Sequence, residues 1–273
     1  MGVIKEMLSY PFLVRAIVGG MLVSLCASLL GVSLVLKRYS MIGDGLSHVS
    51  FGALSVAIAF GWSPLAVSIP VVVLAAFFLL RITENSRLKS DAAIAMISAS
   101  ALAIGIIVTS MTTGMTTDIS SYMFGSILAM SPADVRLGVV LSVVVLGLFL
   151  LCYHKIFAVT FDESFAKATG VRVGLYNVLI AILTAVTIVL GMRMMGAMLI
   201  SSLIIFPALT AMRVFKSFKG VVIASGLLSV VCFLGGMVVS YTLSTPAGAS
   251  VVVMDLLCFL LFSGWAAVRR GRR

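Results

Sequence analysis

Apolar segments of about 20 residues follow one another along almost the whole 273-residue chain, and they restrict its fold more than any other feature. An α-helix needs about that length to cross a hydrocarbon core of roughly 30 Å. Hydrophobic residues make up 62% of the sequence and charged residues only 10%, too few polar groups to cover a soluble globule. The alternating pattern of a membrane β-barrel is absent. We therefore expect an all-α, polytopic transmembrane helical bundle.

The sequence predicts about eight to nine membrane spans in a single domain, residues 1–273. The polar intervals between the apolar segments are too short to hold a soluble core. A further apolar stretch, Ile119–Met130, is too short to cross comfortably and is expected to form a re-entrant or surface helix. Glycines inside the spans, such as Gly31 and Gly236, favour close packing of the helices. The nine candidate spans are residues 12–36, 41–60, 64–81, 92–111, 135–153, 174–192, 196–212, 220–243 and 248–268.

Lysine and arginine are distributed unequally between the two sides of these spans. Of the 19 basic residues, all but Lys5, Arg15, Arg136 and Arg193 fall on one side. Basic loops remain in the cytoplasm, so this side is predicted to be cytoplasmic and to hold the C-terminus. The net charge of +10 could also suggest nucleic acid. Basic residues that flank spans more often orient a membrane protein, so lipid and not nucleic acid is the expected surrounding.

An acid and an imidazole stand near the start of the second span, in the segment Ser40–Ser55. Ionisable groups at membrane depth are unfavourable and usually mark a transport pathway. Asp44 and His48 are one helical turn apart, and Ser40, Ser47 and Ser55 are expected on the same face. A carboxylate and a neutral imidazole can together bind one divalent ion such as zinc or manganese. The alternative is that the two side chains pair with each other or cap the helix.

Two further segments carry weaker signals. Phe161–Gly170 has an acidic start and a glycine end, which indicates a short helix on the cytoplasmic side that either docks a soluble partner or only connects two spans. In Gly196–Ala211, Ser201, Ser202 and Pro207 interrupt an apolar span. A proline frees a backbone carbonyl that can face a cavity, although a tolerated kink explains it equally well. Asp255 is a further intramembrane acid, and its role is left open.

Motifs for several kinds of catalysis are missing from the sequence. No GxxxxGK followed by serine or threonine occurs, so any ATP hydrolysis is expected on another chain. There is no HExxH motif and no serine, histidine and aspartate set in a polar segment, which disfavours a membrane hydrolase. We expect a transport subunit and not an enzyme. The four cysteines lie singly in apolar segments and are expected to be packing residues.

Several motifs together resemble the zinc and manganese permease family of ABC importers. The segment KRYSMIGDGLSHVSFGALSVA, residues 37–57, is similar to the second-helix motif of that family. FDESFAKATGV is similar to its cytoplasmic coupling segment, and MGAMLISSLIIFPALTA to its late-helix signature. TDISSYMFGSILAMSPAD and STPAGASVVV fit as well, so the resemblance covers almost the whole chain in order. Asp255 departs from it, because an apolar residue is expected there.

The resemblance implies a type II ABC importer permease in the bacterial cytoplasmic membrane. Two permease copies would work with two cytoplasmic ATPases, which bind ATP, and with an extracellular or periplasmic metal-binding protein. Asp44 and His48 would contact the ion in transit, zinc ahead of manganese, and no cofactor would be bound permanently. Ser40, Ser47, Ser55, Ser201, Ser202 and Pro207 would line the pathway. The ATPase-coupling residues would be Asp162, Glu163, Ala166, Ala168 and Gly170.

Two other functions agree with the residues alone. A proton-coupled secondary metal transporter would use Asp44 or Asp255 to carry the proton and would need no ATPase. An ABC permease for a metal chelate, such as a siderophore or cobalamin, would need a wider cavity than an acid–imidazole pair indicates. Dependence of uptake on ATP, and competition by free metal, would separate these alternatives.

Overall fold

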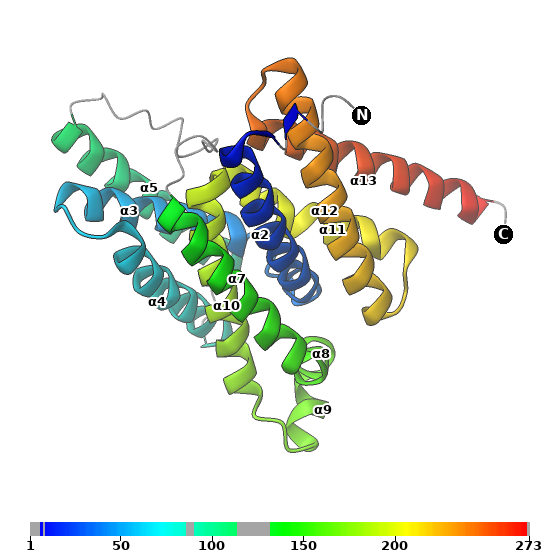
Figure 1. Ribbon diagram of the computed structural model, residues 1–273. Helices are drawn as coiled ribbons and strands as arrows, with labels where there is room; N and C mark the ends of the chain where they lie inside the picture. Colours follow the sequence, from blue (N-terminus) through cyan, green and yellow to red (C-terminus); the bar gives the residue numbers. More distant parts are fainter. Residues whose placement is uncertain (1–5, 8, 86–89, 114–131, 272–273) are drawn as a thin grey trace.

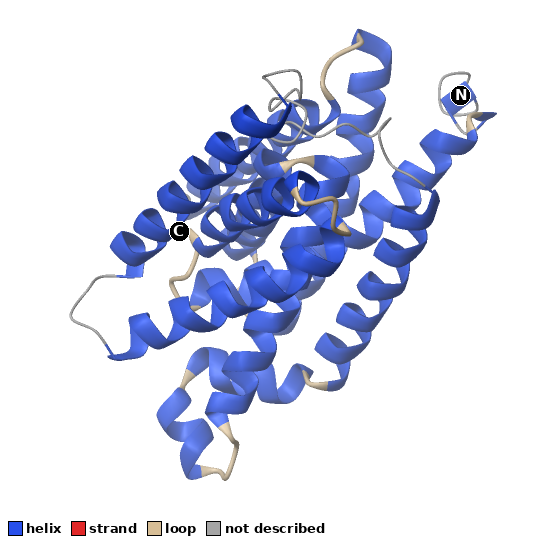
Figure 2. Cartoon of the chain, turned by 90° about the vertical axis from the view of Figure 1, so that its left-hand side faces the viewer, coloured by secondary structure: helices blue, strands red, loops and turns tan. Residues whose placement is uncertain are grey.

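In the computed structural model, described residues 6–7, 9–85, 90–113 and 132–271 form helices joined by short turns, and no strand occurs among them (Figures 1 and 2). The first five long helices are α2 (Pro11–Leu36), α3 (Ile42–Ala59), α4 (Pro64–Asn85), α5 (Ser90–Thr113) and α7 (Pro132–Leu151). They are followed by α8 (Tyr153–Phe161), α9 (Glu163–Ala168), α10 (Val173–Met195), α11 (Ala197–Val214), α12 (Phe218–Leu243) and α13 (Ala247–Gly271).

Each of the nine predicted spans corresponds to one long helix. Seven described helices are long and apolar enough to cross a membrane, and the number becomes eight if α7 and α8, bent by 68°, count as one broken span. In α4 the apolar part, Pro64–Leu79, is shorter. The predicted all-α polytopic bundle is therefore confirmed. The predicted re-entrant or surface helix Ile119–Met130 lies outside the described residues.

Several of the described helices begin at residues that tolerate or satisfy free backbone N–H groups. Proline opens α2, α4 and α7, where its missing N–H costs no helical hydrogen bond. Ser217 caps α12, and its hydroxyl accepts a hydrogen bond from the N–H of Gly220 at 3.2 Å. At these helices a local sequence signal thus coincides with the observed start.

Helix α2 lies at the centre of the bundle, where it packs against α7, α10, α11 and α12 (Figure 1). A second group forms around α3, which packs against α4, α5, α10 and α11. In the most apolar stretch of α2 and of α3, 72% of the residues are buried, compared with 11% in α13. The helix with the candidate metal pair is thus central, whereas α13 is peripheral.

Small and hydroxylated residues hold α2 close to its neighbours. Gly31 lies directly against the backbone carbonyl of Ile204 in α11, so a side chain there would collide with the main chain. The hydroxyl of Ser229 in α12 donates to the carbonyl of Ser24 at 2.8 Å, and one turn away Ser225 donates to Ser28 at 3.2 Å. The predicted role of small residues in helix packing is confirmed at Gly31.

Replacing Gly31 by alanine is expected to destabilise the protein by about 1–3 kcal/mol, because the added methyl group forces α2 and α11 apart. The matched control is Gly147→Ala in α7, where a Cβ meets no atom within 4 Å. The control should be neutral or stabilising, because alanine favours a helix interior. Thermal unfolding in detergent measures both variants, and equal melting temperatures would contradict the close approach.

Candidate functional site

Asp44 and His48 lie in the first two turns of α3 and approach each other as the sequence predicts. The Nε2 atom of His48 is 3.6 Å from Oδ2 of Asp44, longer than a hydrogen bond. The carboxylate is favoured in the first helical turn, where unpaired N–H groups leave positive partial charge. The Asp44 side chain is 47% exposed and that of His48 is 16% exposed. An oxygen and a nitrogen are thus close enough to contact one ion, without being engaged in a tight bond to each other.

The serines predicted on the same face make other contacts. Ser47 donates to the backbone carbonyl of Asp44 at 2.7 Å, and Ser55 donates to that of Phe51 at 3.0 Å. Ser40 lies in the turn before α3, because the helix begins only at Ile42. The expectation that Ser40 belongs to the helical stripe is therefore wrong. Ser47 and Ser55 are buried and hydrogen-bonded within their own helix.

The two adjacent serines of α11 face two different acids. The Ser201 hydroxyl, which donates to the carbonyl of Ala197 at 3.0 Å, also lies near the Asp44 carboxyl group. Ser202 lies on a different side of the helix, and its hydroxyl donates to Oδ2 of Asp255 in α13 at 3.4 Å. Pro207 is buried within α11. Helix α11 therefore lies between the acid of α3 and the acid of α13.

Asp255 is almost completely buried, at 2% exposure. Its partner Ser202 is 53 residues away in the sequence, and the thiol of Cys232 in α12 also lies within reach of its carboxyl group. The sequence shows an intramembrane acid but not its partners, because only the packing of three helices brings them together. All four cysteines are free thiols, as expected of packing residues.

The segment predicted to couple to an ATPase forms helix α9 at the far end of the bundle, next to α8 (Figure 1). Asp162 caps the helix, and its Oδ1 accepts a hydrogen bond from the N–H of Phe165 at 2.9 Å. Gly170, at φ 82°, ends the segment in a left-handed conformation that glycine adopts without strain. A short helix between Asp162 and Gly170 is therefore confirmed.

Within this segment the predicted coupling residues have different surroundings. Ala166 is fully buried and packs with Val159 and Val173, so it holds α9 onto the bundle from inside. Ala168 is exposed. The largest apolar group on the outer surface of α9 is Phe165, at 64% exposure. Sequence reasoning missed it, although a large aromatic residue in a short polar helix is a signal that could have found it.

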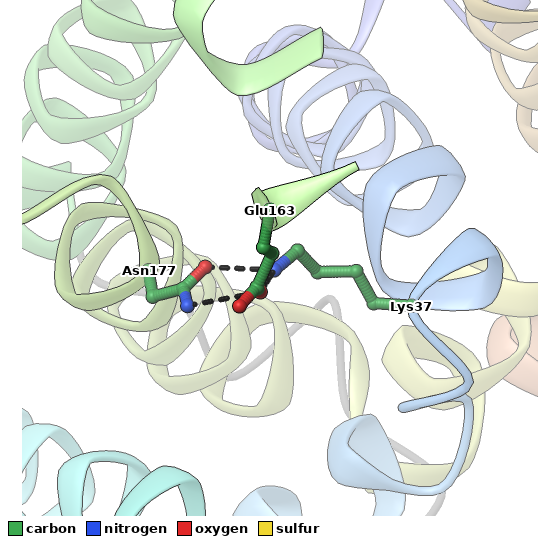
Figure 3. Close-up of polar contacts among 3 residues, drawn as sticks. All are labelled: Lys37, Glu163 and Asn177. Carbon is green, nitrogen blue, oxygen red and sulfur yellow. Dashed lines mark hydrogen bonds and ion pairs between the residues drawn. The ribbon is translucent and has the colours of Figure 1, made fainter. Parts of the chain in front are cut away.

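Glu163 takes part in a polar cluster that joins three segments of the chain (Figure 3). The Nζ atom of Lys37, at the end of α2, donates to Oε1 of Glu163 at 2.6 Å and to Oδ1 of Asn177 in α10 at 2.7 Å. The Nδ2 atom of Asn177 donates to the same Glu163 oxygen at 3.2 Å. Each of the three side chains therefore contacts the other two. Lys37 and Asn177 were not predicted, because they lie 126 and 14 residues from Glu163 in the sequence.

The cluster shifts the acidity of Glu163, which lies outside the membrane spans. Burial raises the pKa of its carboxyl group, but the hydrogen bonds from Lys37 and Asn177 and the nearby positive charges outweigh this, and the net pKa is below its ordinary value. A carboxyl group with a lowered folded-state pKa stabilises the fold fully above its unfolded-state pKa. That contribution is lost as the pH falls through the folded-state pKa.

Acidification below about pH 4.3, the ordinary pKa of glutamate, is therefore expected to lower the melting temperature of the wild type more than that of Glu163→Gln. Melting curves of both proteins in detergent between about pH 3 and 6 measure this difference, and the other carboxyl groups contribute equally to both. Parallel pH profiles would contradict the ionic role of Glu163.

In the part of the chain that the structure describes, no group of three or more His, Cys, Asp and Glu side chains could hold a metal ion. Asp44 and His48 are a pair, and a closed protein site for zinc has four ligands. The pair can therefore contact an ion but cannot enclose it. Such an incomplete site fits an ion in passage better than a structural metal.

A bundle of membrane-length helices, an acid–imidazole pair on a central helix and a short helix that projects from one end together define a polytopic membrane transport protein. The model of the ABC 3 transport family matches residues 9–265, so the chain belongs to the ABC 3 transport family. The resemblance to ABC permeases that the motifs indicate is confirmed.

Several relatives match nearly the whole chain. The manganese import system permease protein ScaB of Streptococcus gordonii is 29% identical over 94% of this chain and 92% of its own length. The high-affinity zinc uptake system membrane protein ZnuB of Haemophilus influenzae is 27% identical over 92% and 97%. The solved structure of PsaBC from Streptococcus pneumoniae in complex with Fab superposes with a TM-score of 0.86, at 29% identity over 96% of this chain and 94% of that one.

Proposed function

We propose that this protein is the membrane subunit of an ATP-driven importer for divalent transition-metal ions, in which Asp44 and His48 contact the ion in transit. The observation that carries the proposal is the approach of the carboxylate oxygen and the imidazole nitrogen to 3.6 Å on a central helix. Zinc and manganese both accept these ligands. Zinc is the first candidate for the transported ion, and manganese is the second. The names of the relatives support metal transport and include both ions.

The exposure of Asp44 supports a second copy of the chain as a partner. Nearly half of this carboxyl side chain is uncovered in the single chain, at 47%. A carboxylate that faces lipid is unfavourable, so this surface is better covered by protein or by a water-filled path. A homodimer that brings two Asp44–His48 pairs to one path would provide four ligand groups, without any single chain having to enclose the ion.

The ATPase is proposed to bind at α9 on the cytoplasmic side of a bacterial cytoplasmic membrane, with the C-terminus on the same side. A metal-binding protein would deliver the ion from the opposite side. ATP-driven closure at the cytoplasmic end would then change which side of the membrane the pathway opens to. Binding by the pair has to stay modest, because the ion must leave in every cycle.

The proposal is tested by reconstituting the permease with its ATPase and its metal-binding protein in vesicles. Uptake of radioactive zinc or manganese should require ATP and persist when the proton gradient is collapsed. Uptake that stops with the proton gradient and ignores ATP would instead establish a secondary transporter, with Asp44 or Asp255 as proton carrier. Uptake of a metal chelate that free metal does not inhibit would establish a chelate permease.

A further inference from the structure

The turn between α2 and α3 connects the polar cluster of Lys37, Glu163 and Asn177 to the metal pair. Helix α2 ends at Leu36, and the N–H of Tyr39 donates to the carbonyl of Leu34 at 2.8 Å while the N–H of Arg38 donates to Val35 at 3.1 Å. Arg38 adopts a left-handed conformation, φ 63°, which completes this hydrogen-bonded helix end. Only the short segment 37–41 separates the two helices. The start of α3 at Ile42 thus lies only five residues after Lys37.

The positive charge of the Lys37 ammonium group is neutralised by the Glu163 carboxylate. Its side chain is only 9% exposed, whereas that of Glu163 is 45% exposed. A cation so little exposed to water needs a charged partner, and Glu163 provides it at 2.6 Å. Glu163 is the first residue of α9 and therefore moves with that helix. The position of α9 thus determines where the Glu163 carboxylate can pair with the Lys37 ammonium group.

Asn177 holds both charged groups against α10. It accepts from Lys37 and donates to Glu163, so it aligns the ion pair from a third segment (Figure 3). A small cavity lined in part by Lys37, Ile42 and Asn177 lies between the turn and α10.

We propose that Lys37 and Asn177 are positioning residues that transmit movement of α9 to the start of α3, and so link the ATPase seat to Asp44 and His48. This inference rests on the proposed function and adds to it the contact through which ATP hydrolysis acts on the metal pair. The connection consists of one buried cation, its carboxylate and the amide that aligns them. If this connection is broken, we expect fewer metal ions to be transported for each ATP hydrolysed.

The experiment uses the reconstituted complex and measures the number of metal ions transported for each ATP hydrolysed. Four proteins are compared: the wild type, Lys37→Met, Glu163→Gln and the double variant. Each single substitution is expected to lower this ratio by roughly fivefold or more, while ATP hydrolysis continues. The double variant is expected to be no worse than either single variant, because both substitutions break the same contact.

The control is Lys155→Met in α8, which removes an exposed cation outside α9 and leaves the three side chains of the cluster in place. It should keep the wild-type ratio. Asn177→Leu should lower the ratio as the other cluster variants do. Co-purification of the ATPase and thermal unfolding show that each variant is folded and assembled.

Unchanged ratios in the single variants, or additive losses in the double variant, would overturn the inference. Neither result would contradict the proposed function, provided that the wild type transports metal when it hydrolyses ATP. A wild-type complex that hydrolyses ATP but moves no metal would contradict the proposed function itself. The two failures are therefore distinguishable in one set of measurements.

Discussion

Replacing His48 by alanine is expected to abolish metal uptake while the protein still folds and assembles. The substitution removes the imidazole nitrogen that we propose contacts the ion, and it leaves Asp44 with no imidazole 3.6 Å away. Loss of a residue that merely orients a metal ligand already costs about 10–100-fold in affinity or activity, so removal of a ligand should cost at least about 100-fold. Uptake of radioactive zinc and manganese into vesicles, with transporter amount quantified, measures the effect.

The chain has only two histidines, so a matched control is available. His154 lies in α8, is exposed, and contacts the ring of Tyr153. His154→Ala removes an imidazole of the same size away from the pair and should leave uptake close to that of the wild type. Wild-type uptake by the His48 variant would remove the pair from the mechanism, whereas equal losses in both variants would indicate a general effect on the protein.

Replacing Phe165 by serine is expected to release the ATPase from the complex. The Phe165 ring is 64% exposed on α9, whereas the next residue, Ala166, is fully buried. The helix therefore packs on the bundle through Ala166 and leaves the ring on its outer surface. Aromatic residues at the centre of interfaces typically contribute at least about 2 kcal/mol, which corresponds to an affinity loss of roughly 30-fold. Co-purification of the ATPase with tagged permease, and titration of purified ATPase onto it, measure the loss.

Phe60 provides the matched comparison for this prediction. It is similarly exposed, at 66%, but it lies at the end of α3 that the distribution of basic residues assigns to the opposite side of the membrane. Phe60→Ser should leave ATPase binding intact. Full retention of the ATPase by Phe165→Ser would exclude Phe165 as an anchor. Loss from both variants would reveal that the assignment of sides is wrong.

The sequence predicted the helices well because their signal is local. Twenty apolar residues in a row specify a membrane helix without reference to any neighbour, and all nine predicted segments are helical. The Asp44–His48 contact was predictable for the same reason, since a spacing of four residues on a helix brings two side chains together. The error at Ser40 arose from the helix start, because a boundary shift of two residues is enough to place a side chain in a turn.

The contacts between helices were not predictable in this way. Ser202 meets Asp255 from 53 residues away, and Lys37 meets Glu163 from 126 residues away. A membrane helix shows which of its residues are polar but not which neighbouring helix they face, because most of its surface is apolar all round. The exposure of Phe165 and the burial of Ala166 likewise depend on how α9 lies on the bundle.

The two hydroxyl bonds from α12 to α2 restrict the movements that a transport cycle can use. Ser225 and Ser229 are one turn apart and both bind backbone carbonyls of α2, so a sliding of either helix would break both bonds together. The contact of Gly31 with the main chain of α11 adds a third fixed point. Helices α2, α11 and α12 are thus held to one another at three points, and we expect them to keep their mutual register while other parts of the bundle move.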